Sequence, residues 1–115
     1  MAPARIAVQI AALPLKVVEK KGGVAPIALP ALLEELRQFG GLRVRGLMTI
    51  SALTEDEAEQ RRAFALLREL RDAGERQGHA LPELSMGMSG DYPIAVEEGA
   101  TMIRLGTVLF GERTV

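Results

Sequence analysis

The stretch from Leu84 to Gly111, LSMGMSGDYPIAVEEGATMIRLGTVLFG, contains two apolar runs that are each followed by glycine and hydroxyl residues. This order of residue types predicts a strand, a small-residue loop, a short helix and a second strand that ends before Gly106 and Thr107. Asp91 is typical of a helix start, and Gly99 is typical of a helix end. The sequence therefore predicts two strand ends with open backbone that lie close together.

Loops of this composition can hold an anion. Ser89 and Gly90 would lie at or just before the helix N-terminus, where unpaired backbone N–H groups favour phosphate. Gly106 adds open backbone after the second strand, and Thr107 adds a hydroxyl donor. The alternative is that these residues only form turns. Two such loops in succession add weight to a phosphate site, because the loops after the last two strands of (β/α)8 barrels commonly hold a phosphate, and both alternatives stay open on the residues alone.

Apolar runs and helical repeats alternate along the rest of the chain. We expect strands over 5–13, 43–50, 83–88 and 101–105, and helices that begin near Pro26 or Pro30, at Thr54 and at Asp91. Thr54 and Glu57 have the spacing of a capping box. The second helix has an apolar stripe and an otherwise solvated, charged face; the stripe comprises Ala63, Leu66, Leu67, Leu70, Ala73 and Gly74. This order predicts parallel strands joined by right-handed crossovers, in one domain over residues 1–115.

SMGMS before an acidic helix start, and MIRLGT before LFG, resemble the C-terminal signature of the YggS/PROSC family. These are the pyridoxal phosphate homeostasis proteins, whose barrel is similar to the N-terminal domain of alanine racemase. LRVRGLMTIS at 42–51 extends the resemblance upstream. The chain has 115 residues, and a complete barrel has about 250. The resemblance therefore implies an α/β fold of parallel (β/α) units, the C-terminal half of a TIM-type (β/α)8 barrel.

The same resemblance implies pyridoxal 5'-phosphate as the cofactor. In this family the phosphate is held at the positions of Ser89, Gly106 and Thr107, and the position of Arg104 lies near the pyridine nitrogen. A guanidinium does not readily give a proton to that nitrogen, so the ring would be a weak electron sink. From the residues alone, Arg104 is expected instead in an ion pair with a nearby carboxylate: Glu97, Glu98 or Glu112.

The family's Schiff-base lysine lies on an early strand, in the half of the barrel that this chain lacks. Lys16, Lys20 and Lys21 fall in an expected solvated loop, and no neighbour would desolvate one of them. The resemblance therefore implies a non-catalytic pyridoxal phosphate binding protein of vitamin B6 homeostasis. Two alternatives stay open: a half-barrel of a racemase-like or other phosphate-ligand enzyme completed by a partner chain, and a truncated reading frame without independent function.

Composition excludes several other classes of function. The net charge is −1, which supports neither nucleic acid nor anionic membrane as a partner. The chain has no cysteine, and its single histidine, His79, is expected to be a solvated turn residue, so we expect no metal site. No apolar run reaches the roughly 18 residues of a membrane span, and the start does not resemble a signal peptide. We therefore expect a soluble, cytoplasmic protein.

A half-barrel also needs a protein partner. Its first and last strands present unpaired backbone groups, and the face that lines the barrel interior is uncovered. We expect a complementary N-terminal half-barrel or a homo-oligomer to cover apolar residues on that face, namely Ile6, Val8, Leu47 and Ile103. The expected small-molecule partner is pyridoxal phosphate or another small phosphate ester.

Overall fold

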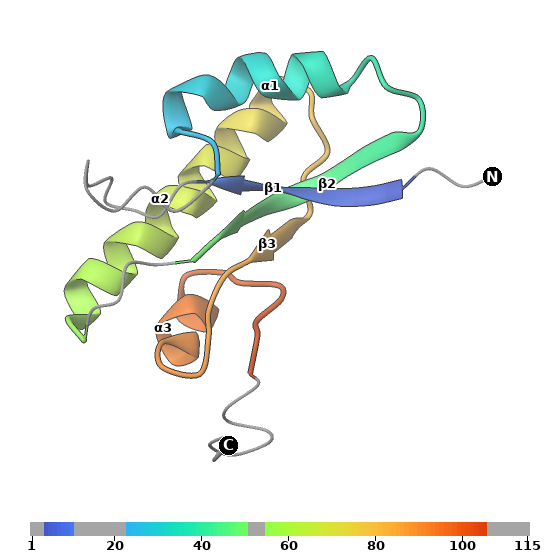
Figure 1. Ribbon diagram of the computed structural model, residues 1–115. Coiled ribbons are helices and arrows are strands. Elements are labelled where there is room, and N and C mark those ends of the chain that lie inside the picture. The colour runs from blue at the N-terminus through green and yellow to red at the C-terminus, as the bar shows by residue number, and fades with distance from the viewer. Residues whose placement is uncertain (1–3, 11–22, 51–54, 106–115) are drawn as a thin grey trace.

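The fold is a three-stranded parallel sheet covered on one face by helices (Figure 1). The computed structural model describes residues 4–10, 23–50 and 55–105. The sheet has the order β1–β2–β3, and its strands are β1 (Ala4–Ile10), β2 (Leu42–Thr49) and β3 (Glu83–Ser85). The helices are η2 (Pro26–Ala28), α1 (Leu29–Leu36), α2 (Glu57–Arg76) and α3 (Tyr92–Glu97). The predicted α/β class with parallel (β/α) units is confirmed.

The hydrophobic core lies between the sheet and the helices α1 and α2. Val8 and Leu47 are register partners, Leu84 is the register partner of Leu47 on β3, and all three are buried in one cluster with Phe64 of α2. Because side chains alternate along a strand, the opposite face of the sheet carries a different set of residues. That set is mostly small or polar, with Met48 as its large apolar member: Arg5, Ala7, Gln9, Arg43, Gly46, Met48 and Ser85.

The expectation that Val8 and Leu47 line an uncovered barrel wall is therefore wrong. Both lie on the face that the helices cover, with 6% and 0% of their surface exposed. Ile6 is half-buried, and its register partner Val44 packs against the same core. The physical reason is that the amphipathic helices pack on the most apolar face of the sheet, and the other face keeps a set that is mostly small or polar.

The C-terminal part of the sheet differs from the expectation for 101–105. In the described residues this segment forms an isolated parallel bridge between Ser85 and Met102 in place of a full strand. The Met86 N–H donates to the Met102 carbonyl at 3.1 Å, and the Arg104 N–H donates to the Gly87 carbonyl at 2.9 Å. Gly87 has a φ of 108°, which is incompatible with an extended strand, so β3 ends at Ser85 rather than at Met88.

Helix α2 begins later than the capping-box pattern predicts. Its N-cap is Asp56, whose Oδ1 accepts the Ala58 N–H at 2.9 Å and the Glu59 N–H at 3.4 Å. Thr54 lies outside the described residues. The predicted stripe also needs correction, because Phe64 is fully buried and Leu66 is 37% exposed.

His79 joins the loop before β3 to helix α1, so the expectation of a solvated turn residue is wrong. Its side chain is only 8% exposed. The Nε2 atom lies 3.1 Å from Oε1 of Glu34, and the Nδ1 atom lies 3.0 Å from Nη2 of Arg37. Gly78, with a φ of 98°, turns the chain back over α1 and brings the imidazole there. The imidazole also lines a pocket of about 210 Å3 between α1 and β2.

Neither a membrane-spanning helix nor a metal-binding cluster is present in the described residues. Within ranges 4–10, 23–50 and 55–105, the helices are too short or too polar to cross a membrane. The same ranges hold no cluster of three or more histidine, aspartate or glutamate side chains that could bind a metal ion.

Candidate functional site

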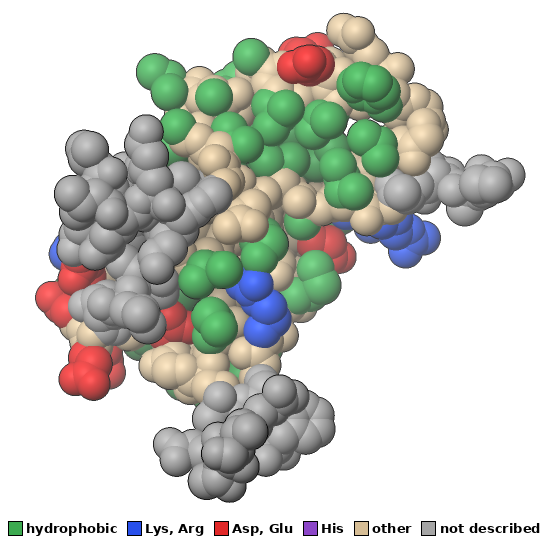
Figure 2. Space-filling model, viewed as in Figure 1, with side chains coloured by type: hydrophobic (Ala, Val, Ile, Leu, Met, Phe, Trp, Pro, Cys, Tyr) green, Lys and Arg blue, Asp and Glu red, His purple; other side chains and the backbone are tan. Residues whose placement is uncertain are grey.

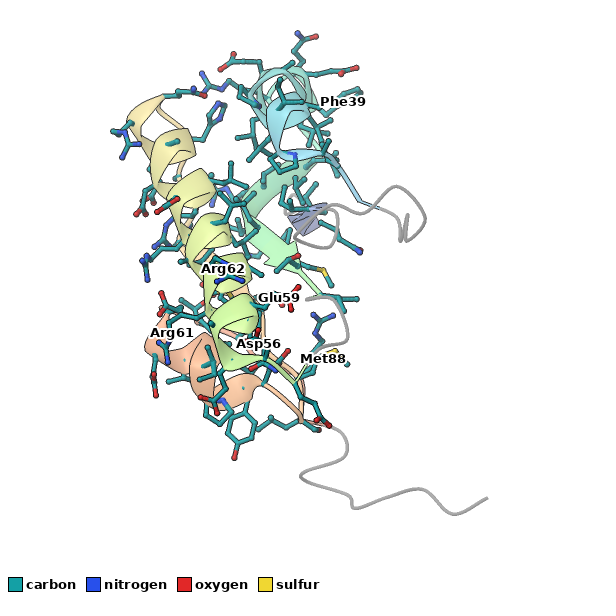
Figure 3. All side chains as sticks on the ribbon, turned by 90° about the vertical axis from the view of Figure 1, so that its left-hand side faces the viewer. Phe39, Asp56, Glu59, Arg61, Arg62 and Met88 are labelled. Atoms are coloured by element: carbon teal, nitrogen blue, oxygen red, sulfur yellow. The ribbon has the colours of Figure 1, made fainter. Side chains whose placement is uncertain are left out.

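The candidate site lies at the carboxyl ends of β2 and β3. The three strands are parallel, so their carboxyl ends share one edge of the sheet, and the loop 86–91 leaves β3 there to enter α3 (Figure 1). Loops at this edge carry the active and binding sites of (β/α)8 barrels. Figure 3 shows Met88 of this loop at the same end of the molecule as Asp56, and Phe39 at the opposite end.

The loop 86–91 has a defined shape. The Met88 N–H donates to Oδ1 of Asp91 at 2.7 Å, and the Tyr92 N–H donates to the Met88 carbonyl at 2.8 Å. At Gly87 a β-carbon would lie 2.8 Å from Cβ of Ala95, so the backbone packs directly on α3. These contacts position Ser89, which is half-buried at the tip of the turn.

Arg104 reaches from the last described segment to the end of β2. Its Nη2 donates to the Thr49 carbonyl at 3.3 Å, and its backbone N–H donates to Gly87. Its Nε is buried and has no hydrogen-bond partner within the described part of the chain. An unsatisfied buried donor costs about 1–3 kcal/mol. This N–H could therefore donate to an acceptor atom of a bound ligand. The residues present thus fit a bound cofactor at this point.

The ion pairs expected for Arg104 with Glu97 and Glu98 are not formed. Both carboxylates bind α2 instead: Arg61 contacts Glu97 at 2.7 Å and Glu98 at 2.8 Å, and Arg68 contacts Glu98 at 2.9 Å. The third expected partner, Glu112, lies outside the described residues.

These contacts also correct the expectation that the charges of α2 form only a solvated face. Figure 3 shows Arg61 on the side of α2 that faces α3, whereas Arg62 lies on another side of the helix. Hydrogen bonds from the Arg61 guanidinium, and then from Arg68, hold the pKa of Glu98 below its usual value. Hydrogen bonds to Glu97 and Glu98 raise the pKa of Arg61 in turn. The ion pairs tie α3, and with it the loop that carries Ser89, to α2.

The structure brings together part of the predicted site. The loop of Ser89 and the backbone of Arg104 are joined through Gly87. Gly106 and Thr107 lie outside the described residues, so their place in the site stays a prediction. Sequence reasoning missed the Asp91 contact, which the Ser-Gly-Asp turn could have indicated because aspartate often bonds nearby backbone N–H groups. It also missed the Thr49 carbonyl, because a backbone acceptor has no sequence signal.

Comparison with known proteins identifies the family of this chain. The family model described as "Alanine racemase, N-terminal domain" matches residues 4–114. A pyridoxal phosphate homeostasis protein of Aquifex aeolicus is 51% identical over 96 residues, which are 83% of this chain and 42% of that protein. The protein of the same name from Pseudomonas aeruginosa is 50% identical over 96 residues, covering 81% and 39% of the two chains. The chain thus spans less than half the length of these relatives.

Solved structures give the same result. PipY of Synechococcus elongatus PCC7942, solved with PLP bound, matches with a TM-score of 0.81 and 39% identity over 96% of this chain and 50% of PipY. The lysine decarboxylase of Selenomonas ruminantium matches with a TM-score of 0.67 at 19% identity, over 91% of this chain and 33% of that one, which is evidence for the fold alone. The resemblance to pyridoxal phosphate homeostasis proteins is confirmed, and the chain belongs to the alanine racemase N-terminal domain family.

Proposed function

We propose that this chain binds pyridoxal 5'-phosphate as part of a protein of vitamin B6 homeostasis. The relatives carry that name, and PipY was solved with PLP bound. Because the chain spans less than half of the curated relatives, the function of the whole protein comes to it only as a proposal. The observation that supports it best is the buried Nε of Arg104 beside the loop 86–91, which has no hydrogen-bond partner among the described residues.

In this proposal Ser89, Gly106 and Thr107 hold the phosphate. Helix α3 has only six residues, so its dipole adds little, and the hydroxyl and backbone N–H groups of the two loops do most of the binding. Arg104 extends toward the ring nitrogen of the ligand and keeps its own proton. The bound cofactor would supply an electron-accepting ring, whose strength depends on protonation of that nitrogen.

We propose further that the chain is not catalytic. Among the described residues, Tyr92 is the acid/base candidate beside the loop 86–91. Covalent attachment of the cofactor is assigned to the other half of the barrel. Borohydride should therefore trap no pyridoxal phosphate adduct at Lys16, Lys20 or Lys21. An adduct that is lost when one of these lysines is replaced would contradict this proposal.

We propose also that a protein partner covers the exposed apolar surface beside β1. This partner is a complementary half-barrel or a second copy of the chain. Figure 2 shows hydrophobic side chains gathered over α1 and between α1 and β1, on the side where β1 has no further strand of the described sheet beside it. Ile27 and Phe39 are 92% and 54% exposed. A further (β/α) unit beside β1 would cover this surface, as it does between consecutive units of a complete barrel.

Titration of the purified full chain tests the cofactor site. Pyridoxal phosphate is expected to bind the wild type and to bind a Ser89→Ala/Thr107→Val variant at least about tenfold more weakly, because two charge-assisted donors are lost. The matched control is Thr101→Val, whose hydroxyl binds Glu83 instead of the assigned site. Equal affinity of the wild type and the Ser89/Thr107 variant, for both pyridoxal phosphate and inorganic phosphate, would show that the assigned phosphate site is wrong.

A further inference from the structure

The amino ends of β1 and β2 carry a cluster of positive charge on the face away from the helices. Arg5 and Arg43 are exposed register partners, so the two side chains stand next to each other on adjacent strands. Arg45 follows at the bulge, where the register between the strands shifts. Figure 2 shows Lys/Arg side chains beside the amino-terminal end of β1. We call Arg5, Arg43 and Arg45 the arginine floor, because they lie at the opposite end of the strands from the candidate site.

Like charges directly opposite on neighbouring strands destabilise a sheet. Within the described residues no carboxylate forms an ion pair with the arginine floor. The acidic residue on the same face of β3 is Glu83, and its Oε2 accepts the Thr101 hydroxyl at 2.8 Å. The cost of placing these arginines together is therefore not offset by the part of the chain that the structure describes.

Closure of a barrel raises that cost. The interior of a (β/α)8 barrel is packed with side chains and holds little water, and buried charges must be paired. The arginine floor lies on the face that such closure encloses. The chain matches 50% of PipY, so closure requires further strands from another segment or chain. Those strands must bring carboxylates to the level of the arginines.

We infer that the arginine floor docks a complementary half-barrel that carries aspartate or glutamate at the amino ends of its own strands, in preference to a second copy of this chain. A second copy that completed a parallel barrel would bring its own Arg5 and Arg43 to the same floor. Like-charge contact of this kind selects against a partner. From the proposed function, the inference takes only the existence of a partner half-barrel. It does not depend on the cofactor site.

A charge-reversed copy of the chain is a suitable probe for this partner. The variant Arg5→Glu/Arg43→Glu is a half-barrel of the same shape with carboxylates at the amino ends of its strands. Sedimentation equilibrium at low salt is expected to show a mixed complex of wild type and variant at least about tenfold tighter than either self-complex. The preference should shrink as salt is added, because exposed charges are screened. The matched control is Arg62→Glu/Arg76→Glu, which makes the same charge change on exposed positions of α2 and is expected to give no preference.

Each other outcome contradicts the inference. A wild-type self-complex as tight as the mixture, no association in any mixture, or equal preference for the control variant would show that the arginine floor does not select the partner. If the reversed variant does not fold by circular dichroism, the neutral Arg5→Gln/Arg43→Gln variant replaces it. Removal of the repulsion should make this variant self-associate more tightly than the wild type, and unchanged self-association overturns the inference. No cofactor is present in these mixtures, so their failure is distinct from failure of the phosphate-site titration.

Discussion

The Nη1 atom of Arg68 donates to both the backbone carbonyl and the Oε1 atom of Glu98, at 2.9 Å each. Arg61 holds the other carboxylate oxygen at 2.8 Å. The Glu98 side chain is 12% exposed, so its charge is largely removed from water and compensated by two guanidinium groups. Glu98 follows α3 directly, and the loop of Ser89 precedes that helix. The contact therefore anchors the element on which the candidate phosphate loop packs.

Replacement of Glu98 by glutamine is expected to lower the free energy of unfolding by about 1–2 kcal/mol, because charge-assisted hydrogen bonds to a mostly buried carboxylate are lost. Urea denaturation of both proteins measures the difference. The control is Glu97→Gln, since Glu97 is 58% exposed and should contribute no more than about 0.5 kcal/mol. Equal effects of the two replacements would contradict the assigned role of Glu98.

The contribution of Glu98 should depend on pH. Its pKa is lowered in the folded protein by the hydrogen bonds from Arg61 and Arg68. A lowered carboxyl pKa gives stability that is fully present above the unfolded pKa of about 4.3 and is lost as the pH falls toward the folded value. The stability difference between wild type and Glu98→Gln should therefore be constant near neutral pH and shrink below about pH 4.3. A difference that grows on acidification would contradict this prediction.

The sequence predicted the order and type of the elements better than their ends. Apolar runs and the 3.6-residue period identified all three described strands and the helices α1 and α2, and residues typical of helix ends identified α3. The end of β3 was missed, because a positive φ at Gly87 depends on how the loop packs on Ala95. The cap of α2 was misplaced because Thr54 and Asp56 are both good N-caps, and pattern alone does not choose between them.

The candidate site was predictable only where side-chain type carries the signal. Ser89 and Arg104 were proposed from the family motif, and the structure joins their segments through Gly87, while their role stays a prediction. The partners of Glu97 and Glu98 could not be predicted from the sequence. Arg61 and Arg68 lie more than 25 positions away, and only tertiary packing brings them near these carboxylates. The set of sheet residues that faces the helices also depends on tertiary packing, which is why Val8 and Leu47 were assigned to the wrong face.

Gly87 is expected to be intolerant of a side chain. Alanine there would place a β-carbon 2.8 Å from Cβ of Ala95 and 3.0 Å from Cγ2 of Ile103, at a φ of 108°. We expect Gly87→Ala to cost about 2–4 kcal/mol of unfolding free energy, from strain and steric overlap together. The control is Gly90→Ala in the same loop, where the β-carbon meets no atom within 4 Å. Thermal unfolding of both variants tests this, and similar melting temperatures would contradict the described loop.

Core packing of α2 gives a direct test of the helix register. Phe64 is fully buried, so Phe64→Ala should destabilise the protein by about 3–5 kcal/mol through lost burial and a cavity. Leu66, on the predicted stripe, is 37% exposed, and Leu66→Ala should cost less than about 1 kcal/mol. Denaturation midpoints at fixed slope measure both. A larger loss at Leu66 would place the apolar stripe on the face predicted from the sequence.

Arg104 should distinguish the ring of the cofactor from its phosphate. If Arg104 acts at the ring nitrogen, Arg104→Met loses a charged hydrogen bond to pyridoxal phosphate, worth about 1.5–3 kcal/mol, or at least about tenfold in affinity. Inorganic phosphate makes no contact with that position, and its affinity should stay within about twofold. Isothermal titration of both ligands into the full chain measures the two affinities, with Arg62→Met on the exposed surface of α2 as the control for lost positive charge.

Two outcomes would reject the position proposed for Arg104. Equal losses for pyridoxal phosphate and inorganic phosphate would place the guanidinium on the phosphate, beside Ser89. No loss for either ligand would leave the Thr49 carbonyl as the partner that the described residues offer to its side chain and make the residue structural. In that case Arg104→Met should lower the melting temperature more than Arg62→Met does, since only Arg104 bonds the end of a neighbouring strand. Pyridoxal phosphate and inorganic phosphate, tested on Arg104→Met and Arg62→Met, therefore separate three roles of Arg104: contact with the ring nitrogen, contact with the phosphate, and a structural contact with β2.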